Sequence, residues 1–295
     1  MTEPDHPETG RTGTRLITGG CVWATVLALC AWDRTDARVS TTVVLMLILA
    51  ATWETAVLVG RFRGVSRNGL FAAVGAGSFG ALWTALHVAV GHDGGAWLFG
   101  ILVVFILGGG LLLRRGHALV SSACEPLPGG NLLAIGLATF TGWALLCLLL
   151  VRGPLVGGEQ GWGWLVWLVA VSKLGDTAAY SVGRSVGGPK LAPTVSPNKT
   201  WSGAAASLAA AVAVGLALGR GLGLDVDAGT LLLLAGVVNV ASQAGDLVES
   251  ALKRRANAKD SGSLLPVIGG ILDLVDSLLL AAPALAGALW FLGAK

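Results

Sequence analysis

The chain has 295 residues, of which 54% are hydrophobic and only 13% are charged, and its mean hydropathy is +0.74. Soluble domains carry about 25% charged residues, so this composition excludes an ordinary soluble protein and indicates an integral membrane protein. The net charge of +3 is too small to favour a nucleic-acid partner, and we expect none. Cys21, Cys30, Cys124 and Cys147 lack metal-binding or redox spacing and are expected to be small apolar side chains.

The apolar runs predict a series of membrane-spanning helices. Residues 1–14 are polar and contain two prolines, so we expect a disordered tail there. A helix needs about 20 apolar residues to cross the hydrocarbon core of a bilayer. Nine candidates follow the tail, at residues 16–32, 40–60, 69–90, 96–113, 131–151, 162–182, 203–219, 229–250 and 271–292. We therefore predict an all-α, polytopic protein of about nine transmembrane helices.

The distribution of Lys and Arg predicts the orientation of these helices, because loops on the cytoplasmic side are enriched in both residues. If the amino terminus is cytoplasmic, the opposite side holds only Arg34, Arg38, Arg152, Arg220 and Lys295. The polar segments 183–202 and 253–270 then face the cytoplasm, where nucleotides are found. We expect a multi-pass protein of the cell inner membrane with a polar pocket that faces the cytoplasm.

The first polar patch lies at the end of the sixth candidate span. Lys173, Asp176 and Tyr180 are spaced i, i+3 and i+7, so they share one helix face. Ionisable residues inside a membrane helix are costly and are often functional. An ion pair between Lys173 and Asp176, and an interfacial anchor at Tyr180, are the structural alternatives.

The second patch is the segment from Gly183 to Gly203, whose Gly and Pro content predicts a loop. Its side chains offer positive charge and hydrogen-bond donors to phosphate oxygens, from Arg184, Lys190, Ser196, Asn198, Lys199 and Thr200. The spacing does not match a P-loop. An ordinary positively charged loop is the alternative.

The third patch runs from Gln243 to Asp276 and is rich in acids and bases. Asp246, Glu249, Ser250 and Lys253 share one helix face, and Asp273 and Asp276 lie three residues apart at the start of the last span. Carboxylates of this kind suit Mg²⁺, which typically takes one or two of them together with substrate phosphates. The alternative is that the acids only neutralise the neighbouring bases.

This third patch resembles the signature of the phosphatidate cytidylyltransferases, also called CDP-diacylglycerol synthases. The positions in register are Ser250, Lys253, Arg254, Lys259, Asp260, Pro266, Gly269, Gly270, Asp273 and Asp276. Other blocks similar to that family occur upstream in the same order, at Asp176 to Tyr180, Gly183-Arg184, Ser196 to Trp201, Gly203 and Gly245 to Leu247. A pattern of this length is highly specific. The amino-terminal half is similar mainly in hydropathy and in its Trp53-Glu54 pair.

The resemblance implies transfer of a cytidylyl group from CTP to phosphatidate, in phospholipid biosynthesis. It assigns Asp246 and Asp273 as metal ligands for Mg²⁺, with a second cation such as K⁺ also expected, and Asp260 and Asp276 in support. It assigns the phosphates of both substrates to Lys199, Lys253, Arg254 and Lys259, and the nucleotide to Ser196, Asn198 and Thr200. Further substrate-binding residues are expected at Asp176, Tyr180, Arg184 and Ser250. The resemblance also implies a homodimer. Within the chain, we expect amino-terminal transmembrane helices in 15–152 and a catalytic transmembrane region in 153–295.

The chain departs from the family signature at two positions. Ile268 replaces a histidine, and Leu274 replaces an arginine. Losing two donors beside phosphates leaves three possibilities open: weakened phosphatidate chemistry, another lipid phosphate as substrate, or an inactive paralogue that binds anionic lipid. A CDP-alcohol phosphotransferase is disfavoured because no Asp-Gly-x-x-Ala-Arg run is present.

Overall fold

The computed structural model describes residues 20–25, 28, 38–61, 65, 68, 70, 72–75, 78, 130–153, 160–264 and 269–292. The predicted tail at 1–14 and the candidate span at 96–113 lie outside the described residues. The candidate spans at 16–32 and 69–90 are described only in part, as helix at 20–25 and at 72–75.

The long helices follow the apolar runs of the sequence. They are α2 (Arg38–Gly60), α5 (Gly130–Arg152), α6 (Gly161–Ser185), α7 (Trp201–Gly221) and α8 (Ala228–Arg255). Four of them, α2, α5, α7 and α8, are long and apolar enough to cross a membrane. The fifth, α6, carries the charged residues of the first patch and is not among those four. A polytopic membrane protein is therefore supported, and the number nine stays a prediction.

The last predicted span is not one continuous helix, and this expectation was wrong. It divides into α9 (Ile271–Val275) and α10 (Leu278–Leu292), which are separated at Asp276 and Ser277. The Asp276 carboxylate accepts the Ser277 N–H at 2.6 Å, and Lys173 Nζ donates to both residues, at 3.3 and 2.7 Å. These polar contacts hold the chain where the two helices meet.

The loop predicted between α6 and α7 contains a short β-hairpin, so the fold is mostly helical rather than all-α. Strand β1 (Lys190–Ala192) pairs antiparallel with β2 (Ser196–Thr200). The Val195 N–H donates to the Ala192 carbonyl at 3.2 Å, which closes a turn with Pro193 in its second position. Proline is favoured there because its fixed φ suits that position. Sequence reasoning took these prolines only as loop signals.

Helix α7 packs closely because one of its faces consists of small residues. Its buried positions recur every fourth residue, at Gly203, Ser207, Ala211, Gly215 and Gly219. A Cβ added at Gly215 would lie 2.8 Å from the Cβ of Ala235 in α8. Small residues at this spacing let helix backbones approach within a membrane. Between α6 and α7, the Trp167 indole N–H donates to the Gly215 carbonyl at 2.8 Å.

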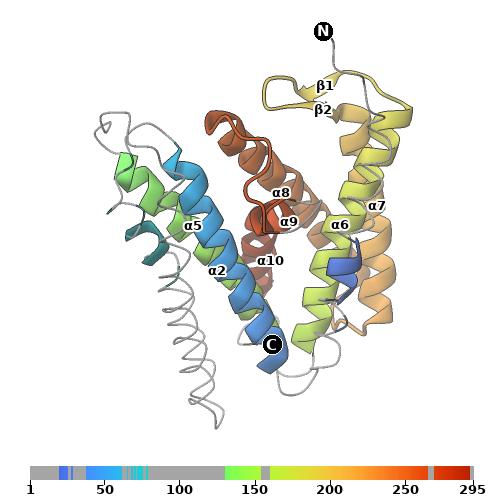
Figure 1. Cartoon of the computed structure of the whole chain (residues 1–295). Coiled ribbons are helices and arrows are strands. Elements are labelled where there is room, and N and C mark those ends of the chain that lie inside the picture. The colour runs from blue at the N-terminus through green and yellow to red at the C-terminus, as the bar shows by residue number, and fades with distance from the viewer. Residues whose placement is uncertain are drawn as a thin grey trace.

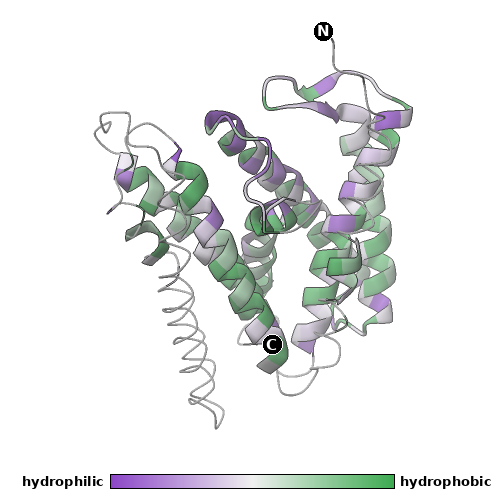
Figure 2. Ribbon diagram, viewed as in Figure 1, coloured by the Kyte–Doolittle hydropathy of each residue, from purple (hydrophilic) through white to green (hydrophobic). Residues whose placement is uncertain are grey.

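The helices form a bundle, with the β-hairpin and the carboxyl-terminal end of α8 at the same end of it (Figure 1). Helix α6 packs along α7, α2 packs along α5, and α10 contacts both α5 and α8, so the predicted amino-terminal and carboxyl-terminal parts pack together. Figure 2 shows hydrophobic residues along most of α2, α5, α6 and α7, and hydrophilic residues at the hairpin and at the carboxyl-terminal end of α8. The three polar patches of the sequence therefore meet at the same end of the bundle.

Candidate functional site

A cavity of about 660 Å³ lies where the hairpin meets α6, α7 and α8. Seven of the residues that the family resemblance assigns to the site line it: Asp176, Tyr180, Arg184, Asn198, Lys199, Thr200 and Asp246. Lys190, Gly203 and Gln243 also form part of its wall. Because the lining comes from all three patches, the fold joins segments that are about 70 residues apart in the chain.

The hairpin is fixed to the helices by local hydrogen bonds. Thr200 is buried, and its Oγ1 accepts the Gly203 N–H at 3.2 Å, so it caps the first turn of α7. Thr and Ser are favoured at this position because the hydroxyl satisfies a free amide at the helix start. The Trp201 N–H donates to the Pro189 carbonyl at 3.1 Å, which holds the entry of the hairpin against its exit. The positions of Lys199 and Asn198 are thereby set by the backbone.

Three carboxylates converge beside the cavity. Oxygen atoms of Asp246, Glu249 and Asp276 all lie within 4.8 Å of one another, and we call these residues the acidic triad. Asp246 belongs both to the triad and to the cavity wall. Glu249 is fully buried, and its Oε1 receives no hydrogen bond from any residue that the structure describes. Hard oxygen donors at this spacing suit a divalent cation such as Mg²⁺.

Each acid of the triad is paired with a lysine. Lys199 Nζ forms an ion pair with Asp246, and Lys253 Nζ lies 2.6 Å from Glu249 Oε2. Lys173 Nζ lies 3.3 Å from Asp276 and 4.0 Å from Asp176. The pair between Lys173 and Asp176, which was the structural alternative for the first patch, is therefore the longer of the two ion pairs that this lysine makes. Buried carboxylates need such partners, because an unpaired buried charge is strongly destabilising.

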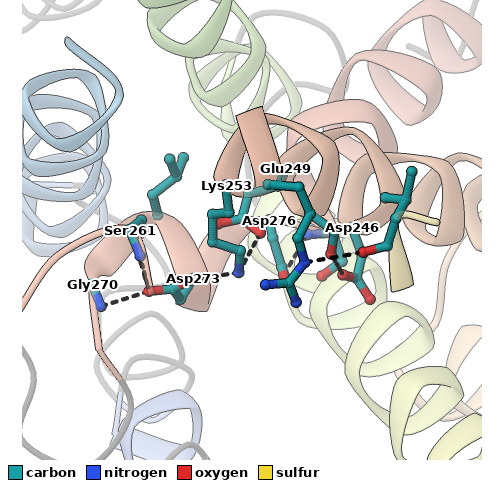
Figure 3. Close-up of polar contacts among 12 residues, drawn as sticks. Asp246, Glu249, Lys253, Ser261, Gly270, Asp273 and Asp276 are labelled. Atoms are coloured by element: carbon teal, nitrogen blue, oxygen red, sulfur yellow. Dashed lines mark hydrogen bonds and ion pairs between the residues drawn. The ribbon is translucent and has the colours of Figure 1, made fainter. Parts of the chain in front are cut away.

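Asp273, predicted as a metal ligand beside Asp246, lies outside the acidic triad. Its Oδ1 lies 2.8 Å from Lys253 Nζ, and its Oδ2 accepts the N–H groups of Ser261 and Gly270, each at 2.8 Å. Figure 3 shows Lys253 between Glu249 and Asp273, so one lysine separates Asp273 from the triad. Asp246 and Asp273 thus belong to one connected polar network, although 27 residues separate them in the sequence. A metal role for Asp273 stays a prediction.

The Gly269-Gly270 pair of the signature has a steric reason. Gly269 adopts φ +119°, a backbone conformation that residues with a side chain rarely adopt. A Cβ added there would lie 2.7 Å from Asp273 Oδ2, and one added at Gly270 would lie 2.8 Å from Glu54 Cδ. The glycines let the backbone approach both carboxylates closely.

The remaining predicted residues lie around the acidic triad and the cavity, and they differ in their contacts and exposure. Ser250 Oγ lies 3.4 Å from Asp246 Oδ1, and Arg254 Nε donates to the Val195 carbonyl at 3.4 Å, which links α8 to the hairpin turn. Lys259 is exposed, and Asp260 is half-buried on the segment that follows α8. Ser196 lies in β2 opposite Ala192 and does not line the cavity.

Two carboxylates near this site, Glu249 and Glu54, were not predicted as site residues from the sequence. Glu249 was recognised on the same helix face as Asp246, among the carboxylates of the third patch, but it was not assigned as a metal ligand. Glu54 was noticed only as part of a Trp-Glu pair, yet it accepts hydrogen bonds from Ser261 and Leu272. For Glu54 the available signal was a single acid within an apolar membrane helix, and for Glu249 it was the shared helix face with Asp246.

The second departure from the family signature has a structural counterpart. Leu274 is 5% exposed and packs in the main hydrophobic core, rather than facing the acidic triad or the cavity. The first departure, Ile268, lies outside the described residues. An arginine at position 274 would have to bring its charge into that apolar core or reach out of it.

We predict that Leu274→Arg destabilises the protein and does not raise its activity. An uncompensated buried charge costs about 3–5 kcal/mol. The thermal unfolding midpoint of the purified protein in detergent should fall clearly. Leu274→Met, which conserves volume and apolarity, should cost less than about 1.5 kcal/mol. A stable Leu274→Arg protein with faster turnover would show that this position does reach the reaction centre.

The comparison with known proteins agrees with these features. The model of the cytidylyltransferase family matches residues 13–292. A phosphatidate cytidylyltransferase of Brucella suis is 43% identical over 196 residues, covering 65% of this chain and 71% of the relative. Enzymes of the same name from Bacillus subtilis and Staphylococcus epidermidis are 41% and 39% identical over 127 residues, which is 43% of this chain and 47% and 49% of theirs. With a family match over nearly its whole length and with the acidic triad beside a basic cavity, the chain belongs to the cytidylyltransferase family.

Proposed function

We propose that the protein transfers the cytidylyl group of CTP to phosphatidate. An oxygen of the lipid phosphate would bond to the α-phosphorus of CTP, while the bond from that phosphorus to the bridging β-phosphate oxygen breaks. The electron pair leaves with pyrophosphate, and CDP-diacylglycerol is the lipid product. The attacking phosphate is already an anion, so no strong general base is required. Catalysis then consists of positioning and charge neutralisation.

The observation that carries this proposal is the position of Asp246. It is shared by the acidic triad and by a cavity whose wall also holds Arg184, Lys190 and Lys199. A triphosphate needs both kinds of partner, cationic side chains for its oxygens and carboxylates for its metal. The 43% identity to a phosphatidate cytidylyltransferase supports phosphatidate as the acceptor.

The chemistry of the acidic triad fits Mg²⁺. The buried Glu249 Oε1, which has no hydrogen-bond partner among the described residues, is an oxygen that a cation would satisfy. Asp246, Glu249 and Asp276 would hold the ion, which neutralises phosphate charge and orients the triphosphate when bound. Mg²⁺ usually keeps several waters and takes few protein ligands, so three carboxylates are sufficient. Asp273 as a further ligand and K⁺ as a second cation stay predictions.

The side chains around the triad have distinct roles in this proposal. Lys199 pairs with Asp246 and is well placed to exchange that contact for a phosphate oxygen. Lys173 holds Asp276 and Ser277 at the break between α9 and α10, which keeps one metal ligand in place. The Arg184 guanidinium, which donates to the Tyr180 hydroxyl at 2.7 Å, lies on the cavity wall as a second phosphate contact. Lys253, Arg254 and Lys259 as contacts to the substrate phosphates stay predictions.

The nature of the acceptor is tested by pyrophosphate release with different lipid phosphates. The purified protein in mixed micelles should release pyrophosphate from CTP when phosphatidate and Mg²⁺ are both present. EDTA should stop the release, and excess Mg²⁺ should restore it. Faster release with another lipid phosphate than with phosphatidate would favour the alternative substrate. The homodimer that the family resemblance implies stays a prediction.

We also propose that the polar end of the bundle faces the cytoplasm, in the inner membrane. Val186 lies at the hairpin end of the bundle and Gly221 at the opposite end, and both positions are exposed. The test uses the variants Val186→Cys and Gly221→Cys in a background from which the native cysteines have been removed. An impermeant thiol reagent applied from outside should label the second variant only. Permeabilised cells should label both. Labelling of Val186→Cys from outside would separate the site from cytoplasmic CTP and would contradict the proposal.

A further inference from the structure

Glu54 is a buried acid in a helix that is otherwise apolar. It is 3% exposed, and apart from Arg38 at the first position it is the only charged residue of α2. Charged side chains inside a membrane helix are costly unless the protein supplies polar partners.

The partners of Glu54 are on the segment that carries Asp273. Its Oε2 accepts the Leu272 N–H at 2.7 Å and lies 3.1 Å from Ser261 Oγ. These residues follow Glu54 by more than 200 positions in the chain. Gly262 and Gly270 pack directly on its carboxylate, where an added Cβ would overlap it. Through Glu54, helix α2 therefore holds Ser261 and Gly262, which follow α8, together with Gly270 and Leu272 at the start of α9.

A relay of contacts runs from Glu54 to the acidic triad. Ser261 Oγ lies 2.9 Å from Asp273 Oδ2 as well as 3.1 Å from Glu54 Oε2, so its single O–H is within hydrogen-bond distance of both carboxylates. The other oxygen of Asp273 lies 2.8 Å from Lys253 Nζ, and Lys253 lies 2.6 Å from Glu249 of the triad. Figure 3 shows the part of this relay from Ser261 and Gly270 through Asp273 to Lys253 and Glu249.

We propose that Glu54 is a positioning residue that holds Asp273, and through it Lys253, in place beside the acidic triad. It acts through Ser261 and Leu272, because it belongs neither to the cavity wall nor to the triad. The catalytic consequence of this positioning rests on the proposed cytidylyl transfer. The mechanical consequence does not: without Glu54, the segment 259–273 loses two of its hydrogen bonds to the rest of the bundle.

Two measurements on the full-length protein test the two consequences separately. Hydrogen exchange, followed by mass spectrometry in nanodiscs, reports on residues 259–273 whether or not the protein is active. Steady-state kinetics with CTP and phosphatidate report on catalysis. Glu54→Ala should speed exchange in 259–273 and lower kcat by about 10- to 100-fold, as for other residues that orient a metal site. The KM for CTP should stay close to the wild-type value, because the cavity wall is untouched.

Two further variants keep the test decisive if the alanine protein folds poorly. Glu54→Gln keeps an oxygen for the Leu272 N–H but loses the charge, so smaller changes in the same direction are expected. Ser261→Ala removes the bridging hydroxyl, and its effect combined with Glu54→Gln should be less than additive, because both act through one contact. Thr55→Val is the matched control. Thr55 follows Glu54 in α2, and its substitution removes a buried contact of 3.2 Å between the hydroxyl oxygens of Thr55 and Thr141. It should change neither kcat nor exchange in 259–273.

The outcomes separate the inference from the proposed function. Wild-type exchange and kcat in both Glu54 variants would overturn the positioning role. A rise in the KM for CTP without faster exchange would also overturn it, since Glu54 would then act on nucleotide binding. If the wild-type protein transfers no cytidylyl group but the Glu54 variants exchange faster in 259–273, the positioning role of Glu54 is retained and the proposed function is rejected.

Discussion

Asp246→Asn is expected to abolish cytidylyl transfer while leaving the fold intact. The substitution removes the one carboxylate that belongs to both the acidic triad and the cavity, and it also removes the partner of Lys199. A neutral amide is a poor ligand for Mg²⁺ and does not hold the charge of the lysine. We expect kcat to fall by about a thousand-fold or more, equivalent to about 4 kcal/mol of lost transition-state stabilisation.

The matched control for this prediction is Asp225→Asn. Asp225 is an exposed aspartate at the opposite end of the bundle, in the turn between α7 and α8. Its substitution should leave kcat unchanged. Both variants should keep the thermal unfolding midpoint of the wild type within the error of the measurement. Near-normal turnover by Asp246→Asn would reassign this residue to a structural role and would remove the metal site from the proposed mechanism.

Lys253→Met is expected to destabilise the protein as well as to inactivate it. Lys253 is the shared partner of Glu249 and Asp273, and Glu249 is fully buried. Removing one partner of a buried ion pair typically costs about 3–5 kcal/mol, because the remaining charge is left uncompensated. The thermal unfolding midpoint in detergent should therefore fall sharply, and cytidylyl transfer should be lost.

A double substitution distinguishes the two effects of Lys253. In Lys253→Met combined with Glu249→Gln, the unpaired buried charge is gone, so much of the lost stability should return. Activity should not return, because the acidic triad then has one carboxylate fewer. Arg255→Met, an exposed neighbour on α8, should behave as the wild type in unfolding. A stable Lys253→Met single variant would show that Glu249 is held by other contacts.

The sequence predicted the long helices well because their signal is local. The runs at 40–60, 131–151, 203–219 and 229–250 each lie within a single helix, and α8 extends five residues beyond its predicted end. That extension carries the basic residues Lys253, Arg254 and Arg255, of which Lys253 is paired with Glu249 and Asp273. The break at Asp276 and Ser277 was not predicted, because it depends on Lys173, about 100 residues away.

The site was predicted in composition but not in detail. Family-like blocks identified Asp246, Lys199 and Asp276 as neighbours in function, and the structure brings them together. The placement of Asp273 one lysine away from the triad depends on how the segment after α8 folds back, which no helical periodicity encodes. The contribution of Glu54 was hidden for the same reason: its partners lie more than 200 residues away.

The most direct test of the account follows the two ends of the CTP triphosphate. The purified protein, reconstituted with phosphatidate and Mg²⁺, is supplied with CTP labelled either at the α-phosphorus or at the γ-phosphorus. We predict that the α-label enters the lipid phase and the γ-label stays in water as pyrophosphate, with both changes dependent on phosphatidate. If a folded protein moves no α-label into lipid, or moves the γ-label instead, cytidylyl transfer is not its reaction.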